Sequence, residues 1–136
     1  MDPLSVPSRI LEFGPGVSSL ASHLAAMGHH TTTVDLRRYP YRHGNLRSIE
    51  KDFLEVPMDE KSFDCVYAIS AIEHVGLERY GRGHPKMKIP ENGDVKVAGK
   101  ICHILKPGGR FTFTVPFGIR GRAESYRVMI ERRSES

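Results

Sequence analysis

The fold of this chain is decided close to its start, by the stretch Glu12-Phe13-Gly14-Pro15-Gly16-Val17-Ser18. A short apolar run over residues 9–13 leads into the glycines and predicts a strand. Apolar residues then recur at helical spacing until Gly28, which predicts a helix that ends there. Gly14 permits the tight turn between strand and helix, and Gly16 lets a ligand approach the backbone closely.

The spacing of the glycines excludes one phosphate-binding loop and counts against another. No Gly-Lys-Ser or Gly-Lys-Thr follows, so the turn does not form a triphosphate-binding loop. Ser19 stands where the dinucleotide pattern G-x-G-x-x-G/A has its last small residue, which counts against a nicotinamide site.

Strands and helices alternate along the rest of the chain. Apolar or β-branched runs predict strands over residues 30–35, 46–50, 62–70 and 110–115. Helices are predicted over residues 71–76 and 94–105, with loops over 36–46 and 77–93. Because parallel strands need crossover connections, this alternation predicts an α/β fold with a doubly wound, mainly parallel sheet. Right-handed crossovers favour the strand order 3-2-1-4-5, with helices on both faces.

The helix over residues 94–105 is expected to bury one apolar face. Asp94 is its expected N-cap, and its apolar positions are Val95, Ala98, Ile101, Cys102 and Leu105. The helix is expected to end at Lys106-Pro107-Gly108-Gly109. Both cysteines, Cys65 and Cys102, lie in apolar surroundings, so we expect buried thiols rather than a disulfide or a metal site.

The composition is that of an average globular protein. The 136 residues are 39% hydrophobic and 26% charged, with a formal charge of +4 at pH 7. We expect a single domain over residues 1–136, with a core over 9–118 and a tail over 119–136. No apolar run is long enough to cross a membrane, and the N-terminus lacks the features of a secretory signal, so a cytoplasmic protein is expected. The mild basic charge permits an anionic ligand and does not require nucleic acid.

Two acidic residues follow the second and third predicted strands. Asp35 stands about 20 residues after the glycines, where a carboxylate accepts hydrogen bonds from both hydroxyls of a ribose. Asp52 can accept from an exocyclic amine such as that of adenine, and Phe53 could cover a flat ring. Ligands of doubly wound sheets bind at the carboxyl ends of the strands. Gly14, Gly16, Asp35, Asp52 and Phe53 are therefore predicted to share one ligand site.

Four stretches occur in the order typical of one enzyme family. They are Ile10-Leu11-Glu12-Phe13-Gly14-Pro15-Gly16, Thr33-Val34-Asp35, Ser62-Phe63-Asp64-Cys65-Val66-Tyr67 running into Ile72-Glu73-His74-Val75, and Leu105-Lys106-Pro107-Gly108-Gly109-Arg110. Over residues 9–118 the chain resembles a class I S-adenosylmethionine-dependent methyltransferase with a Rossmann-like sheet. The resemblance implies S-adenosylmethionine as cofactor and S-adenosylhomocysteine as product. It also implies that Asp35 holds the ribose, that Asp52 contacts adenine, and that Glu12 orders the glycine turn and the methionine end of the cofactor. With the resemblance, the predicted cofactor site comprises Glu12, Gly14, Pro15, Gly16, Asp35, Leu36, Asp52, Phe53 and Ser70.

The same resemblance places Glu73 and His74 at the rim of the cofactor site, just after the fourth strand. His74 could act as a base, shape the acceptor pocket, or only form a local hydrogen bond within the fold. The loop over residues 77–93 is the candidate acceptor loop. The other histidines lack the spacing of metal ligands, so no metal site is predicted.

The sequence departs from the family at two places. Ser18 stands at the third position of the usual G-x-G-x-G. After the fifth strand only an arginine-rich tail remains, with at most one helix over residues 124–133. The chain thus looks like a truncated or minimal methyltransferase core that lacks the usual C-terminal antiparallel hairpin. Its fifth strand would then be an exposed edge, and we expect a homodimer formed through this strand or the tail.

Three functions are compatible with the sequence. The first is methyl transfer from S-adenosylmethionine to a small-molecule or saccharide-like acceptor. The second is a non-catalytic module that binds the cofactor or serves in assembly. The third is a nicotinamide-dependent dehydrogenase, against which Ser19 and Asp52 count. Neither a membrane nor a nucleic acid is an expected partner.

Overall fold

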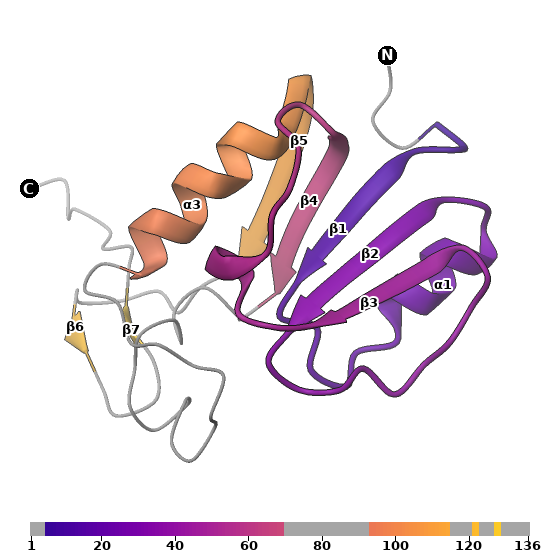
Figure 1. The fold of residues 1–136 in the computed structure, drawn as a ribbon, viewed down its shortest axis with the longest axis horizontal. Helices are drawn as coiled ribbons and strands as arrows, with labels where there is room; N and C mark the ends of the chain where they lie inside the picture. The colour runs from indigo at the N-terminus through magenta and orange to yellow at the C-terminus, as the bar shows by residue number, and fades with distance from the viewer. Residues whose placement is uncertain (1–4, 70–92, 115–120, 123–126, 129–136) are drawn as a thin grey trace, which may run out of the picture.

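The computed structural model of the chain describes residues 5–69, 93–114, 121–122 and 127–128 (Figure 1). Five strands pair in parallel to form one sheet in the order β3-β2-β1-β4-β5. These strands are β1 (Arg9–Phe13), β2 (His30–Asp35), β3 (Leu46–Glu50), β4 (Phe63–Ile69) and β5 (Leu105–Thr114). The predicted α/β fold and its strand order are confirmed.

The first strand and helix form around the glycine turn, as predicted. β1 lies in the middle of the sheet, between β2 and β4. The helix α1 (Leu20–Ala26) follows the turn and buries Ala21 and Ala25. Gly28 ends this helix at a φ of +102°, which glycine adopts without strain. Because β1 is a central strand, the glycine turn that follows it lies at the carboxyl end in the middle of the sheet.

The connection from β2 to β3 is a loop, as predicted, and β3 leads into a short helix. This 3-10 helix, η1 (Phe53–Glu55), was not predicted. The register pairs Asp35 of β2 with Glu50 of β3, so the two strands end at the same edge of the sheet. Residues 52–55 consequently follow β3 at the edge where Asp35 lies.

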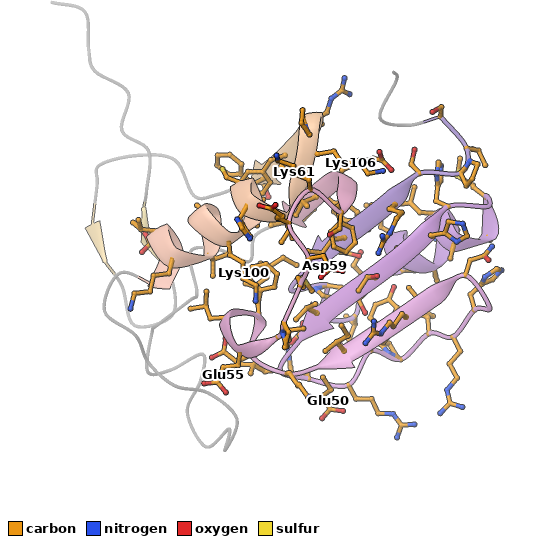
Figure 2. The ribbon with its side chains drawn as sticks, turned by 45° about the horizontal axis from the view of Figure 1, so that its top comes forward. Glu50, Glu55, Asp59, Lys61, Lys100 and Lys106 are labelled. Carbon is orange, nitrogen blue, oxygen red and sulfur yellow. The ribbon has the colours of Figure 1, made fainter. Side chains whose placement is uncertain are left out.

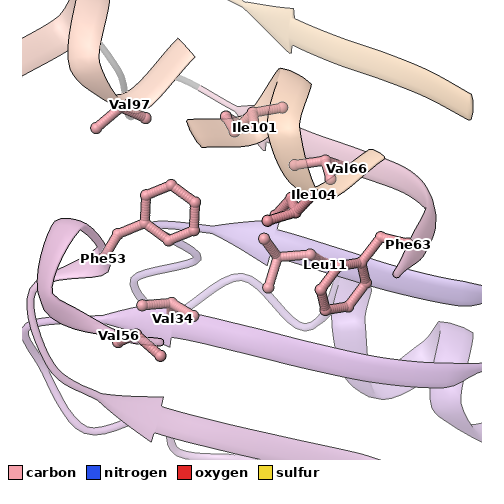
Figure 3. Close-up of a cluster of buried hydrophobic side chains, with 10 residues drawn as sticks. Leu11, Val34, Phe53, Val56, Phe63, Val66, Val97, Ile101 and Ile104 are labelled. Atoms are coloured by element: carbon pink, nitrogen blue, oxygen red, sulfur yellow. The ribbon is translucent and has the colours of Figure 1, made fainter. Parts of the chain in front are cut away.

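The core is divided into two clusters, one on each face of the sheet. The larger cluster lies between the sheet, η1 and the helix α3 (Gly93–Ile104), and contains Leu11, Val34, Phe53, Val56, Phe63, Val66, Ala68, Val97, Ile101 and Ile104 (Figure 3). The smaller cluster contains Ile10, Cys65 and Tyr67, against which Leu24 of α1 packs. Helices therefore cover both faces of the sheet, as predicted.

α3 buries only part of the predicted face, since Ile101 is buried as expected and Val95 and Cys102 are not. Its buried residues are Gly93, Val97, Ile101 and Ile104, whereas Val95 is 66% exposed and Cys102 is exposed. The sequence carries two apolar stripes at helical spacing, and the sheet selects the stripe that continues into Ile104. The prediction of Cys102 as a buried thiol is therefore wrong, while that of Cys65 is confirmed. Asp94 lies within the first turn of the helix rather than at its cap.

The segment predicted to end α3 belongs to β5 instead. α3 ends at Ile104, and β5 begins at the next residue. The pairing with β4 is irregular here: Phe63 faces Leu105, and Cys65 faces Arg110. Gly109 permits this irregularity, because a Cβ on it would lie 2.8 Å from the Lys106 carbonyl oxygen. The glycines therefore serve a bulge within the strand, which sequence patterns describe equally well as a helix end.

The tail forms a pair of short strands at the positions that the structure describes. β6 (Gly121–Arg122) pairs in antiparallel fashion with β7 (Arg127–Val128), apart from the five-stranded sheet. The prediction of a helix over residues 124–133 is thus wrong at 127–128, where an extended backbone suits a β-branched valine. Among the described residues, no helix is long and apolar enough to span a membrane.

Candidate cofactor site

The glycine turn after β1 has a backbone that other residues adopt only with strain. Gly14 and Gly16 have φ angles of +64° and +56°. The Gly14 N–H donates to the carbonyl oxygen of Val34, at 2.8 Å, and so ties the turn to β2. The tight turn predicted at Gly14 is confirmed by this left-handed conformation, which Gly16 shares, while the approach of a ligand at Gly16 stays a prediction.

Asp35 is the acid that meets this turn. Its side chain is 5% exposed, at the carboxyl end of β2. Oδ2 accepts a hydrogen bond from the Gly16 N–H at 2.9 Å, and Oδ1 accepts one from the Arg37 N–H at 2.9 Å. Two residues that lie 19 positions apart in the sequence are thus joined directly, at the edge of the sheet where the sequence placed both.

Arg37 is a residue of this edge that sequence analysis missed. Its Nε lies 3.3 Å from Asp35 Oδ1, and one terminal nitrogen lies 3.5 Å from Oδ2. The same guanidinium group would lie 3.2 Å from a Cβ on Gly16, so it covers the glycine turn. The arginine side chain is 55% exposed and can leave this position at little cost in solvation.

Glu12 is buried beneath the turn, on the face of the sheet that α1 covers. Its Oε2 accepts a hydrogen bond from the Tyr67 hydroxyl at 2.8 Å. Burial raises the pKa of Glu12 from 4.5 to about 7, and the nearby Asp35 adds to this rise. Hydrogen bonds from Tyr67 and from the backbone of Ala21 oppose it. Glu12 can therefore exchange a proton near neutral pH at the point where β1 meets the turn.

Two tyrosines complete this buried cluster, and neither was predicted. Tyr67 lies directly across from Glu12 in the register of β1 and β4, and burial raises its pKa. The Tyr39 hydroxyl donates to the Ser18 carbonyl oxygen at 2.7 Å, which ties the loop after β2 to the turn. The register could have identified Tyr67, since parallel pairing places Glu12 beside the fourth strand. No sequence signal identifies Tyr39.

Asp52 and Phe53 lie at the start of η1, in different environments. Asp52 Oδ1 accepts a hydrogen bond from the Leu54 N–H at 3.0 Å and caps the helix. Among the described residues, Asp52 Oδ2 has no hydrogen bond. The Phe53 ring is 2% exposed and packs edge-on against Phe13, with 5.2 Å between the ring centroids. The expectation that Phe53 covers a flat ligand ring therefore finds no exposed ring face; this side chain anchors η1 in the core.

A cavity of about 240 Å³ adjoins Asp35, on the side of β2 and β3. Its walls are formed by these strands and the loop between them, and comprise Thr33, Asp35, Arg37, Arg38, Tyr39, Tyr41, Arg42, Ser48, Ile49 and Glu50. Asp35 is the only residue of the predicted cofactor site in this lining, so the cavity touches that site at the ribose acid alone.

The remaining predicted residues divide into two groups. Pro15 is buried within the turn, and Leu36 is half-buried directly after Asp35. Ser70, Glu73 and His74 lie outside the described residues, as does the loop over residues 77–92. Their predicted roles therefore stay predictions. In the described part of the chain, no three histidine, cysteine, aspartate or glutamate side chains form a group that could hold a metal.

Comparisons with solved structures agree with this arrangement. The 1,6-didemethyltoxoflavin-N1-methyltransferase of Burkholderia thailandensis, solved with bound S-adenosylhomocysteine, has a TM-score of 0.68 and 24% identity. The similarity covers 91% of this chain and 55% of that one. A putative sarcosine dimethylglycine methyltransferase from Galdieria sulphuraria has a TM-score of 0.64 and 18% identity, over 87% of this chain and 44% of that one. At these identities the comparisons establish the fold.

Comparisons of sequence give the family. The sterol 24-C-methyltransferase erg-4 of Neurospora crassa is 29% identical over 115 residues, covering 76% of this chain. The alignment spans 26% of that relative, so the chain corresponds to about a quarter of its length. The family described as a methyltransferase domain matches residues 2–132. The chain belongs to this methyltransferase-domain family and has the fold of the class I S-adenosylmethionine-dependent methyltransferases.

Proposed function

We propose that this chain binds S-adenosylmethionine at the edge formed by the glycine turn, Asp35 and Asp52, and takes part in methyl transfer to a small organic acceptor. The observation that carries the proposal is the hydrogen bond between Asp35 Oδ2 and the Gly16 N–H. It fixes a buried carboxylate beside a turn that lacks side chains at Gly14 and Gly16, so a ligand that displaces the Arg37 guanidinium can reach both the acid and the backbone.

The hydrogen bonds of Asp35 fit a ribose with two hydroxyl groups. A carboxylate has about four lone-pair sites. Backbone N–H groups occupy one site on each oxygen of Asp35, and the long contacts from the exposed Arg37 guanidinium occupy the others. Displacing this guanidinium leaves one site on each oxygen. Asp35 would then hold both ribose hydroxyls while keeping its bonds to the backbone.

The other residues of the edge have separate roles in this proposal. Asp52 Oδ2 would accept from the exocyclic amine of adenine, since Oδ1 is engaged in capping η1. Glu12 would steady the turn through the Tyr67 hydroxyl at the methionine end of the cofactor. When bound, S-adenosylmethionine supplies an activated methyl group for in-line displacement, a reaction that depends mainly on positioning. Glu73 and His74 remain the predicted candidates for a base where the acceptor must lose a proton.

The relatives support a class of acceptor rather than a particular molecule. The names of the relatives refer to a sterol and to 1,6-didemethyltoxoflavin, both of them small organic molecules. A small-molecule acceptor for this chain is our inference from those names. A saccharide-like acceptor stays a prediction from the sequence.

Calorimetric titration of the chain with S-adenosylmethionine, S-adenosylhomocysteine and NAD tests the proposal. We expect the first two ligands to bind and NAD not to bind. Asp35→Ala should weaken binding at least about tenfold, because each of its two hydrogen bonds to the ribose would contribute about 1.5–3 kcal/mol. Asp64→Asn is the matched control, a buried strand aspartate at the opposite end of the sheet, and should bind as the wild type does.

Two outcomes would change the conclusion. Binding of NAD without binding of S-adenosylhomocysteine would overturn the proposed cofactor. Binding of S-adenosylhomocysteine, with no methyl transfer to any acceptor from a small-molecule panel, would support the alternative of a non-catalytic cofactor-binding module.

A further inference from the structure

Lys100 lies on α3 and contacts η1, the short helix that begins beside Asp52 (Figure 2). Its Nζ donates hydrogen bonds to the carbonyl oxygens of Phe53 and Val56. The same nitrogen lies 4.7 Å from the centroid of the Phe53 ring, within the range of a cation–π interaction. One lysine therefore holds the first residue of η1 and the residue that follows its end.

These contacts leave the lysine in an environment that is costly for a charge. The residue is half-buried, and burial lowers the pKa of Lys100, while the nearby Asp52 opposes that effect. Carbonyl oxygens and an aromatic face compensate part of the lost hydration. Lys100 thus lies beside the face of α3 that buries Val97, Ile101 and Ile104, and its charged end contacts η1.

The short helix η1 is held at both of its ends. At its start, Asp52 caps η1 through the Leu54 N–H. At its end, the Val56 N–H donates to the Phe53 carbonyl at 3.3 Å, and Lys100 donates to the same carbonyl. The Phe53 ring is buried in the main core, together with Val97 and Ile101 of α3. Lys100 adds polar contacts between α3 and the backbone of this segment.

We propose that Lys100 is a positioning residue for the adenine end of the cofactor, which it orients by fixing η1 and thereby the carboxylate of Asp52. The inference rests on the proposed function, in which Asp52 accepts from the exocyclic amine. Without Lys100, the Val56 carbonyl loses its lysine donor, the Phe53 carbonyl keeps the Val56 N–H, and the end of η1 is released. The carboxylate of Asp52 then loses its fixed position relative to Asp35, and recognition of the amine is lost with it.

The test compares two probes that differ only at the amine. They are S-adenosylhomocysteine and its purine analogue, which lacks the exocyclic amine. We expect the wild-type chain to bind S-adenosylhomocysteine at least about fivefold more tightly than the analogue, as one hydrogen bond to a carboxylate would give. In Lys100→Met, the affinity for S-adenosylhomocysteine should fall to about the affinity for the analogue. The affinity for the analogue itself should change less than about twofold.

Two further variants separate positioning from a general loss of structure. Lys100→Arg keeps a charged donor and should keep the preference for S-adenosylhomocysteine. Lys100→Gln cannot reach both carbonyl oxygens and should lose the preference, which gives a second measurement where Lys100→Met fails to fold. Lys106→Met is the matched control, since Lys106 contacts Asp64 at the other end of the sheet (Figure 2).

The outcomes distinguish the inference from the function on which it rests. Equal weakening of both probes in Lys100→Met and Lys100→Gln, or an unchanged preference in both, overturns the role of Lys100 while leaving the cofactor in place. A wild-type chain that binds neither probe overturns the proposed function, and the inference with it.

Discussion

The stability of the Glu12→Gln variant relative to the wild type should increase as the pH rises. Glu12 is 1% exposed, and its burial raises the pKa of the carboxyl group from 4.5 to about 7. The folded chain therefore holds this proton more tightly than the unfolded chain does. The stability that this proton contributes is complete below about pH 4.5 and is lost as the pH rises through about 7.

The magnitude follows from the two pKa values. Each unit of difference corresponds to about 1.4 kcal/mol, so the wild type should lose about 3 kcal/mol of unfolding free energy between pH 4.5 and pH 8 through Glu12. Glu12→Gln removes the titration and keeps an oxygen that can accept from Tyr67. The difference in stability between variant and wild type should therefore change by about 3 kcal/mol in favour of the variant over this range.

Urea unfolding followed by circular dichroism at several pH values measures this difference. Comparison with the wild type at each pH cancels the titration of all other groups. Glu60→Gln, which removes an exposed carboxylate, is the control and should show no such change. A stability difference for Glu12→Gln that stays constant within about 1 kcal/mol from pH 4.5 to pH 8 would refute the argument from burial.

Three other substitutions have definite expectations. Gly16→Val should cost about 1–2 kcal/mol of stability, because a φ of +56° strains any other residue, and should weaken S-adenosylhomocysteine binding at least tenfold; unchanged affinity in calorimetry would place the ligand elsewhere. Asp64→Asn should cost about 1–3 kcal/mol in urea unfolding, because Asp64 accepts from both the Arg9 N–H and Lys106 and an amide keeps only one acceptor oxygen; a cost near zero would contradict this. Burial opposes the lowered pKa of Asp64, but its hydrogen bonds prevail, so this stability should be present above about pH 3.8 and be lost at lower pH. Phe113→Lys on the edge strand should abolish the homodimer that the sequence predicts; sedimentation of a wild-type monomer at every concentration would show that no such dimer exists.

The sheet could be predicted because its strands are short apolar runs bounded by strong turn signals. β1 and β3 have the predicted bounds, and β2 ends at Asp35 as expected. Once the order of elements is known, parallel pairing brings the glycine turn and Asp35 to one edge. The contact between Asp35 and Gly16 could therefore be anticipated from the sequence.

The parts that could not be predicted depend on contacts between distant residues. The choice between the Val95 and Val97 faces of α3 is made by the sheet beneath the helix, and both faces have helical spacing. The contact of Lys100 with η1 joins residues more than 40 positions apart, and no local pattern marks it. Arg37 likewise became part of the site through its contact with Asp35, although its neighbours in sequence already indicated a ligand.

The central claim is that the cofactor binds at the glycine turn, and amide resonances in nuclear magnetic resonance spectra test it most directly. Isotope-labelled chain would be titrated with S-adenosylhomocysteine while the backbone amides are observed. We predict that the largest shifts occur at Gly14, Gly16 and Asp35, whose amides lie at the carboxyl edge of β1 and β2. The amide of Asp64, at the opposite end of the sheet, should stay unchanged. Shifts confined to residues away from the turn, or no shifts at saturating ligand, would contradict the claim.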